Sequence, residues 1–543
     1  MLEKLITDTR KDYKVGQLDP NKTEIIIAGP GVGKTTELLN RIEQALGEGV
    51  PPIEIAFFSF STTAVNEGLD RITQRLNYKK AQFRYFKTLH AMAFQLLGLD
   101  SKQIISYAQM NQFAKANDLK LSGIDYRTGV TKYQTPDSIL LSQIDSARLL
   151  GLSIREYFVK YHLDDASIAK AEDLADKYQK FKIANGIVDF TDMILFANEV
   201  DLDTPYFKYM FIDEAQDLST QQWKFVEKLA KNTENIVVVG DERQAIAEFA
   251  GADVDYFLGI KGKITTLNQS HRIPKNIHTL ARRVEKFMIK TRNANWKPRP
   301  LDFQEKVPGE IIRLTELPVR DMARGSWLVL TRTNAQLTEF KDYMMQYCTL
   351  LPTFFTIDGQ APIDTEVFKA IKIFDAINIS SKVTKYDFIM PADDDTPEKL
   401  KKKASFITLM KKFMSSKAPK TAELDSVFLH RFSYKNWFDA FDKLSIPEKK
   451  YIQTILTAYN KNPEAFNQSK IKLSTIHSAK GMEADNVILY TALTGKVYNE
   501  WQQYKDTNDT EAKVLFVGVT RARRKLYLLG NPNTKYSYKD MLE

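Results

Sequence analysis

A glycine-rich run near the start of the chain has the residue types that hold nucleotide phosphates. Glycines let the backbone fold around phosphate oxygens so that its amide N–H groups point inward, and a lysine ammonium can reach the β- and γ-phosphates. The run comprises Ala28, Gly29, Pro30, Gly31, Val32, Gly33, Lys34, Thr35 and Thr36. It predicts a nucleoside triphosphate site in which Lys34 binds the phosphates and the Thr35 hydroxyl ligates Mg²⁺.

Two adjacent acids supply the second part of this chemistry. Asp213 and Glu214 follow the apolar run 209–212. In a phosphate-transferring site, Asp213 would bind Mg²⁺ through water, and Glu214 would position and deprotonate the attacking water. An ordinary turn after a strand is the alternative, since this dipeptide is common. The phosphate-binding run and Gln244, which follows a further apolar run and could touch the γ-phosphate, favour the metal site.

These side chains must be positioned by strands and helices, and the apolar pattern predicts both. Short apolar runs bounded by polar or glycine residues are typical of buried parallel strands. They occur at 25–27, 55–58, 209–212, 236–239, 327–330, 471–475, 487–490 and 526–529. Helical patterns lie between them, and Ser219 with Gln222 predicts a capping box. Strands that alternate with helices predict an α/β fold with parallel sheets.

Two long stretches interrupt this alternation. Residues 96–188 have a helical pattern without a strong strand signal, and residues 380–465 are rich in lysine and also helical. Both are therefore interpreted as insertions into the α/β framework. The lysine run 401–403 is either a solvated helix face or a DNA contact, and the sequence favours neither.

Composition limits the classes of protein that remain. The 543 residues include 77 Lys and Arg against 68 Asp and Glu, a net charge of +9 that permits a polyanionic partner. Cys348 is the single cysteine, which excludes an internal disulfide framework, a cysteine-based zinc site and an iron–sulfur cluster. The sequence contains neither an apolar run of membrane-spanning length nor the apolar core of a signal peptide. A reducing, cytoplasmic location without a membrane partner is expected.

Nine segments, taken in order, resemble the motifs of superfamily 1 DNA helicases of the UvrD/Rep/PcrA type. A single segment is modest support, whereas nine in the family's order are specific. The segments are AGPGVGKTT (28–36), FFSFSTTAVNE (57–67), FKTLHAMAF (86–94), FIDEAQD (211–217), VVVGDERQAIAEFAGAD (237–253), LNQSHR (267–272), TRTNAQL (331–337), STIHSAKGMEADNVIL (474–489) and VGVTRAR (517–523). The resemblance covers the chain from about residue 25 to the end and is weak in the two insertions.

The resemblance implies two RecA-like P-loop motor domains that hold ATP in the cleft between them. Each motor domain carries a mainly helical insertion. The first motor domain would comprise residues 1–95 and 189–275, with its insertion at 96–188. The second would comprise residues 276–379 and 466–543, with a shortened, Lys-rich insertion at 380–465.

The resemblance also implies roles for individual residues. Gln244, Arg272 and Arg521 would contact the γ-phosphate, and Gly481 and Glu483 would lie near the ribose and the γ-phosphate. His271 occupies the place of a tyrosine that stacks on adenine, and Gln17 is the candidate for the adenine-recognising glutamine. The single-stranded DNA track would be lined by Phe60, Thr62, Thr88, His90, Phe249, Arg332, Asn334, Thr475 and His477.

These expectations define an ATP- and Mg²⁺-dependent motor that moves on single-stranded DNA, in the 3′→5′ direction by resemblance, and unwinds duplexes. Expected partners are single-stranded DNA, single-strand/duplex junctions and proteins of replication, repair or recombination; the oligomeric state is open. Two alternatives remain: a translocase that strips proteins from DNA with little unwinding, and an ATP-gated nucleic-acid-binding protein. The presence of Glu214, Arg272 and Arg521 argues against the second alternative.

Overall fold

The computed structural model describes most of the chain. The described residues are 18–59, 62–76, 78–121, 124–125, 130–131, 135–161, 163–164, 166–247, 251–292, 295–301, 308–347, 355–364, 366–379, 408, 411–414, 436–458, 470–504 and 509–543. Several residues singled out in the sequence lie outside this part of the chain: Gln17, Phe60, Phe249, Cys348 and the lysine run 401–403.

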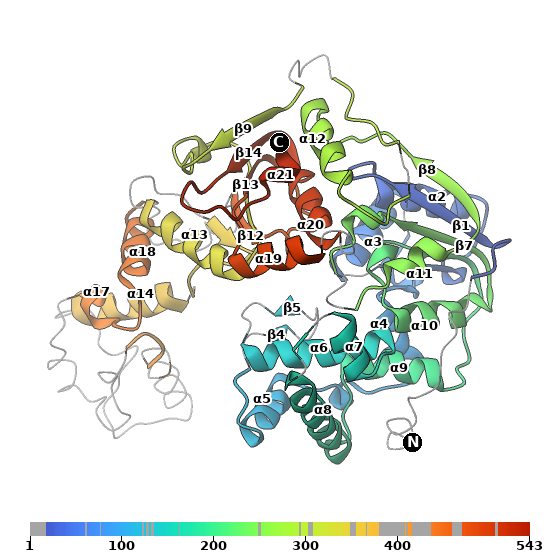
Figure 1. The fold of residues 1–543 in the computed structure, drawn as a ribbon. Helices are drawn as coiled ribbons and strands as arrows, with labels where there is room; N and C mark the ends of the chain where they lie inside the picture. Colours follow the sequence, from blue (N-terminus) through green and yellow to red (C-terminus); the bar gives the residue numbers. More distant parts are fainter. Residues whose placement is uncertain are drawn as a thin grey trace. The chain divides into compact units, whose positions relative to one another are not determined.

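The chain forms two compact units. The first contains the described residues of Met1–Ile311, Leu493–Arg524 and Tyr536–Glu543. The second contains those of Ile312–Ala492 and Lys525–Lys535. Each unit is built around a six-stranded sheet (Figure 1).

The sheet of the first unit is parallel throughout, with the strand order β3-β2-β6-β7-β1-β8. Its strands are β1 (Thr23–Ala28), β2 (Ile55–Phe58), β3 (Phe86–Lys87), β6 (Phe207–Ile212), β7 (Thr233–Gly240) and β8 (Lys263–Leu267). The carboxyl ends of β1, β6 and β7 lie next to one another, because β7 pairs with both neighbours in register. This edge is where an open parallel sheet places its ligands.

Side chains alternate between the two faces of this sheet along each strand, and the side chains on both faces are apolar. Helices therefore cover both faces. Ile25 and Ile27 belong to a core with α4 (Leu89–Leu96), α9 (Phe190–Glu199) and α10 (Thr220–Ala230). Ile26 belongs to a second core with α2 (Lys34–Gly47) and α3 (Thr62–Leu76). The remaining helices of the unit outside the insertion are α11 (Val254–Gly259), α12 (Lys275–Glu285), α19 (Gly495–Tyr504), α20 (Thr510–Val519) and α21 (Lys539–Leu542).

The first insertion has its own apolar core. Its helices are α5 (Tyr107–Ala116), α6 (Pro136–Leu150), α7 (Ile154–Lys160) and α8 (Ala166–Asn185). Two short strands, β4 (Ile124–Asp125) and β5 (Val130–Thr131), form an antiparallel pair between α5 and α6. The helical character of 96–188 agrees with the sequence pattern. The two-residue strands were not predicted, because they are too short to carry a period.

The second unit contains the other sheet, with the strand order β11-β12-β10-β13-β14-β9. Its strands are β9 (Glu310–Leu314), β10 (Trp327–Thr331), β11 (Phe355–Ile357), β12 (Ile471–Thr475), β13 (Ala484–Tyr490) and β14 (Ala522–Leu529). Strand β10 pairs in parallel with β12 and β13. Its helices are α13 (Asn334–Tyr347), α14 (Glu366–Ile379), α17 (Trp437–Ala440) and α18 (Ile446–Ala458), which share one core with the sheet.

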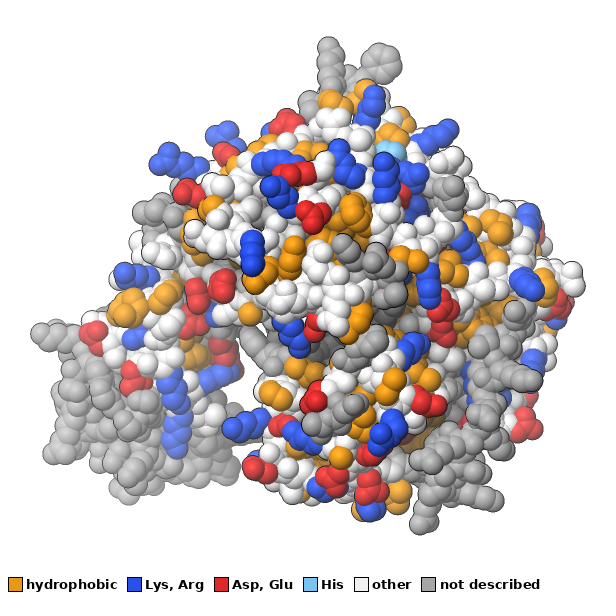
Figure 2. All heavy atoms as spheres, viewed as in Figure 1, with side chains coloured by type: hydrophobic (Ala, Val, Ile, Leu, Met, Phe, Trp, Pro, Cys, Tyr) orange, Lys and Arg blue, Asp and Glu red, His pale blue; other side chains and the backbone are white. Residues whose placement is uncertain are grey.

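The α/β fold with parallel sheets is therefore confirmed, and every predicted strand is present. The capping box at Ser219 is also confirmed, since Ser219 Oγ accepts from the N–H of Gln222 and the Gln222 side chain accepts from the N–H of Ser219. Among the described helices, none is long and apolar enough to span a bilayer. On the face shown in Figure 2, acidic and basic side chains are interspersed.

Candidate nucleotide-binding site

The glycine-rich run forms the turn between β1 and α2. Gly31 and Gly33 have φ angles of 69° and 85°, in the left-handed region that glycine adopts without strain. Gly33 is the N-cap of α2 and provides no side chain to cap the helix. The first-turn N–H groups of α2 can therefore point at a bound phosphate, and the positive end of the helix dipole favours its charge.

The acid pair lies directly beside this turn. The Thr35 hydroxyl donates to Asp213 Oδ2 at 2.8 Å, so a hydroxyl and a carboxylate converge at the end of β6. Both are hard oxygen donors of the kind that Mg²⁺ prefers, and the two residues fit that ion. Burial and the neighbouring charge of Glu214 raise the pKa of Asp213 to about 6, with Lys34 opposing the shift.

Lys34 faces the second acid of the pair. Its Nζ lies 3.4 Å from Glu214 Oε1, and its side chain is 10% exposed. Burial by itself would lower the pKa of Lys34. The charges of Glu214, Asp241 and Asp213 outweigh burial and raise that pKa, so the side chain is a cation at neutral pH.

Glu214 is held in an unusual backbone conformation. Its φ of 51° is in the left-handed region, which costs energy for a residue with a side chain. Gln216, which is fully buried, donates from Nε2 to Glu214 Oε2 at 2.6 Å and accepts from the N–H of Asp241 at 2.9 Å. Gln216 therefore fixes the Glu214 carboxylate relative to the end of β7. Gln216 lies within the segment FIDEAQD (211–217), but this role was not predicted from the sequence.

Gln244 and Arg521 meet although 277 positions separate them. Arg521 Nη2 donates to Gln244 Oε1 at 2.7 Å, and Gln244 Nε2 donates to Asp241 Oδ2 at 2.6 Å. Arg521 follows α20 and is 1% exposed. Burial of a cation is costly unless partners satisfy it, as Gln244 does here. The expected division placed Arg521 in the second motor domain, whereas it lies in the first compact unit together with Gln244.

Residues 270–272 lie against the phosphate-binding turn. Ser270 Oγ donates to the carbonyl of Pro30 at 2.9 Å, and the N–H of His271 donates to the carbonyl of Gly31 at 2.8 Å. A Cβ on Gly31 would lie 2.4 Å from the Cβ of Arg272, so only glycine fits there. Arg272 is thereby placed beside the turn that carries Lys34. The contribution of Ser270 was not predicted.

The candidate DNA-binding residues of the second unit gather at one edge of its sheet. Thr331 pairs with Thr475 at the carboxyl ends of β10 and β12. Arg332 follows β10, Asn334 begins α13, and His477 follows β12. Burial, reinforced by the charges of Arg332 and Lys480, lowers the pKa of His477 to about 3, so this imidazole is neutral. Gly481, with a φ of 82°, and Glu483 lie in the turn before β13.

The candidate DNA-binding residues of the first unit that the structure describes lie at the starts of α3 and α4. Thr62 is the first residue of α3 and is exposed. Thr88 is the N-cap of α4, and its hydroxyl accepts from the N–H of Ala91 at 3.2 Å. The hydroxyl of Thr88 thus has a structural role whether or not it also contacts DNA.

His90 in α4 packs edge-on against Phe190, with ring centroids 5.8 Å apart. Burial lowers the pKa of His90 to about 4, although the charge of Asp189 opposes the shift. We therefore expect His90 to stay neutral between about pH 8 and about pH 5.5, in contrast to an ordinary histidine. An NMR titration of the imidazole resonances, assigned with the variant His90→Gln, measures this; a midpoint near 6.5 would contradict the burial argument.

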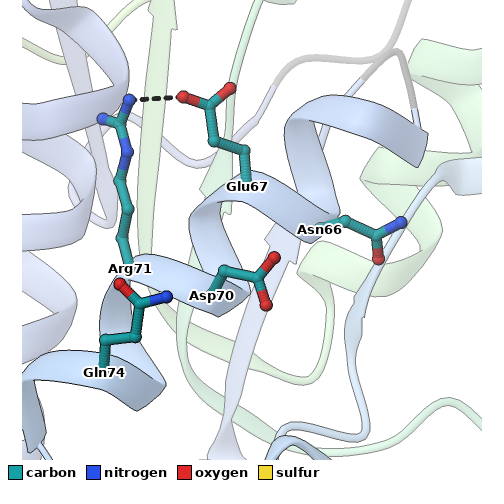
Figure 3. Close-up of a pocket in the computed structure, with 5 residues that line it drawn as sticks. All are labelled: Asn66, Glu67, Asp70, Arg71 and Gln74. Atoms are coloured by element: carbon teal, nitrogen blue, oxygen red, sulfur yellow. Dashed lines mark hydrogen bonds and ion pairs between the residues drawn. The ribbon is translucent and has the colours of Figure 1, made fainter. Parts of the chain in front are cut away.

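A pocket on α3 is separate from these groups. Figure 3 shows its lining of Asn66, Glu67, Asp70, Arg71 and Gln74, all from one helix. Glu67 and Arg71 form an ion pair one helical turn apart, as is common on solvated helix faces. None of the residues with phosphate or DNA chemistry lines this pocket, and we assign no function to it.

Comparison with known proteins adds an independent finding. Residues 10–265 match the family model of the UvrD/REP helicase N-terminal domain, and residues 376–531 match that of the UvrD-like helicase C-terminal domain. The chain is 24% identical to ATP-dependent DNA helicase PcrA of Bacillus subtilis, over 93% of this chain and 80% of that protein. It is 22% identical to a probable DNA helicase II homolog of Mycoplasma genitalium, over 93% and 82% of the two chains.

Proposed function

The chain belongs to the UvrD/Rep family of DNA helicases, and we propose that it couples ATP hydrolysis to 3′→5′ movement along single-stranded DNA and thereby separates duplex strands. As a member of this family it is a DNA-dependent ATPase and an ATP-dependent DNA helicase. The direction, the residues and the mode of DNA contact are the parts of the proposal that need tests.

One observation carries the site assignment: groups from distant parts of the first unit contact the phosphate-binding turn or bond to the acids that act on Lys34. Lys34 lies beside Glu214, Thr35 bonds to Asp213, and Arg521 bonds to Gln244. Arg272 packs against Gly31 in the same turn. A P-loop, a metal-binding acid, a general base and arginines are the parts that phosphoryl transfer from ATP requires.

In the proposed reaction each group has one task. Lys34 and the amides of α2 bind the β- and γ-phosphates, while Thr35 and Asp213 would hold Mg²⁺. The ion, when bound, neutralises charge that develops on the phosphates. Glu214 accepts the proton of the attacking water, and Gln216 keeps the Glu214 carboxylate in place. Gln244, Arg272 and Arg521 stabilise negative charge on the transferred group.

Adenine and ribose contacts are also proposed. His271 is exposed beside the turn, where an imidazole can stack on a purine. We propose that Gly481 and Glu483 lie near the ribose and the γ-phosphate of the bound nucleotide. We also retain as a proposal the division into motor domains at 1–95 and 189–275, and at 276–379 and 466–543, with insertions at 96–188 and 380–465.

The proposed DNA track uses groups that hold the backbone without reading the sequence. Hydroxyl, amide, imidazole and guanidinium groups position phosphates and sugars, and they carry no base specificity. Thr62, Thr88, Thr475, Asn334 and Arg332 supply such groups. Because His90 and His477 are neutral, we propose that they act as hydrogen-bonding or stacking groups rather than as cations. Base stacking is proposed for Phe60 and Phe249.

Unwinding of tailed duplexes tests this proposal. Substrates that carry a single-stranded tail at either the 3′ or the 5′ end, matched in sequence, should be separated only when the tail is 3′ and ATP with Mg²⁺ is present. Unwinding from the 5′ tail would refute the direction. ATP hydrolysis and displacement of a bound protein without strand separation would identify a stripping translocase, and DNA affinity that responds to ATP without movement would identify an ATP-gated binding protein.

A further inference from the structure

Three buried side chains connect the phosphate-binding turn with the residues that hold Gln244. They are Arg243, Glu285 and Trp296, which we call the brace. None of the three has a role predicted from the sequence. Arg243 is 1% exposed and Trp296 is 3% exposed, and the side chain of Glu285 is 10% exposed. All three belong to the first compact unit.

At one end, the brace packs on the phosphate-binding turn. A Cβ on Gly29 would lie 2.8 Å from both Cβ and Cγ of Trp296, so the indole fills the space that glycine leaves open. The Trp296 backbone is held as well, since its carbonyl lies 2.9 Å from His278 Nε2. Any shift of the indole is therefore transmitted to Gly29 by direct contact, because packed groups cannot deform independently.

In the middle, one carboxylate joins the indole to the arginine. Glu285 Oε1 accepts from Trp296 Nε1 at 2.8 Å and from Arg243 Nη1 at 3.2 Å. Two donors on one buried oxygen define its position from both sides. Phe516 completes the packing, with its ring 6.2 Å from Trp296 and 6.0 Å from the Arg243 guanidinium carbon.

At the other end, the brace reaches the side chain that holds Gln244. Arg243 Nε donates to Asp241 Oδ1 at 2.7 Å, while Asp241 Oδ2 accepts from Gln244. Arg243 Nη2 also lies 3.5 Å from the carbonyl of Ala28, the last residue before the turn. The guanidinium thus contacts both the start of the phosphate-binding turn and the support of Gln244, with its five donors in a rigid plane.

We propose that Arg243, Glu285 and Trp296 are positioning residues for ATP hydrolysis, which hold the phosphate-binding turn and Gln244 in one fixed relation. The inference rests on the proposed function of that site. None of the three touches the groups that react, so their effect must pass through Gly29, Ala28 and Asp241. A small misplacement of catalytic groups is sufficient to cost one to two orders of magnitude in rate.

Two conservative substitutions separate this role from simple packing. Trp296→Phe keeps a ring against Gly29 but removes the N–H that Glu285 accepts. Glu285→Gln keeps an acceptor for the indole but removes the charge that faces Arg243. We compare both, and their combination, with wild type in the full chain, using ATP, Mg²⁺ and a saturating oligothymidylate strand. The readouts are kcat, KM for ATP and the thermal midpoint of unfolding.

Arg282→Gln is the matched control. Arg282 forms an ion pair with the other oxygen of the same Glu285 carboxylate, but its side chain is 36% exposed. Removal of this partner leaves the contacts of Glu285 with Trp296 and Arg243 intact. We expect kcat and KM of this variant to stay within about twofold of wild type.

If the brace positions catalytic groups, each single variant lowers kcat about tenfold or more while KM changes about twofold or less. The loss of kcat in the double variant should be no greater than the larger loss in a single variant, because the contacts of the brace depend on one another and their effects are not additive. Wild-type kcat in both single variants, a lowered thermal midpoint without a change in kcat, or losses that multiply would each overturn the proposal. Should Glu285→Gln fail to fold, Arg243→Lys takes its place under the same criteria.

Lys34→Ala measured in parallel separates the two levels of inference. If Lys34→Ala is inactive while the brace variants keep wild-type kcat, the brace is refuted and the nucleotide site stands. If Lys34→Ala hydrolyses ATP at the wild-type rate, the site assignment fails and the brace fails with it.

Discussion

Lys34→Ala is expected to lower DNA-stimulated ATP hydrolysis by about 100-fold or more, because it removes the cation that we propose binds the β- and γ-phosphates. Lys34 is buried, and the charges of Glu214, Asp241, Asp213 and Asp217 raise its pKa, so it remains charged. Steady-state hydrolysis with and without single-stranded DNA measures the effect. Unwinding of a 3′-tailed duplex should be lost in parallel.

The control for this experiment is a lysine that also forms an ion pair with an acid but is exposed to solvent. Lys177 in α8 forms an ion pair with Asp173 at 2.7 Å, and both side chains are about half exposed. Lys177→Ala should therefore leave hydrolysis unchanged. Lys34→Met, which keeps most of the side-chain length, guards against a packing defect at position 34. Hydrolysis at the wild-type rate in Lys34→Ala would remove the P-loop assignment.

Sequence patterns predicted the parts of the fold that depend on neighbours along the chain. The runs at 25–27 and 236–239 are strands because short apolar segments can be buried only in the middle of a covered sheet. The capping box at Ser219 was predictable because both of its hydrogen bonds join residues three positions apart. The glycine-rich run 28–36 was predictable for the same reason, since its glycines, lysine and threonine act within a few residues.

Contacts between distant segments could not be predicted in this way. The sequence shows Arg243 and Glu285 as two charged residues among many, for which a solvated position is the usual one. The structure buries both side chains because each has partners. Arg243 donates to Asp241 and Glu285, and Glu285 accepts from Arg243 and Trp296. Arg521 meets Gln244 because α20 folds back into the first unit, and no local pattern predicts this long-range pairing; only the family resemblance indicated that the two residues lie near each other.

The replacement Glu214→Gln is expected to separate ATP binding from ATP hydrolysis. Glutamine has nearly the same size as glutamate but cannot accept a proton from water, and loss of a general base costs about 10²- to 10⁴-fold in rate. Lys34, Thr35 and Asp213 are left in place, so affinity for ATP should stay close to that of wild type. Single-turnover hydrolysis and equilibrium binding of a fluorescent ATP analogue measure the two quantities.

The local structure makes Glu214→Gln a sharper test than removal of the side chain. Gln216 Nε2 donates to Glu214 Oε2, and a glutamine at position 214 can still present its carbonyl oxygen to that donor. Its backbone would remain at a φ of 51°, a strain that any residue with a side chain shares there. Loss of hydrolysis with ATP binding retained would therefore isolate the proton-accepting role.

The exposed acid Glu234 at the far end of β7 provides the control Glu234→Gln, which should hydrolyse ATP as wild type does. If Glu214→Gln hydrolyses ATP at the wild-type rate, another group accepts the proton, and the strained conformation of Glu214 needs a different explanation.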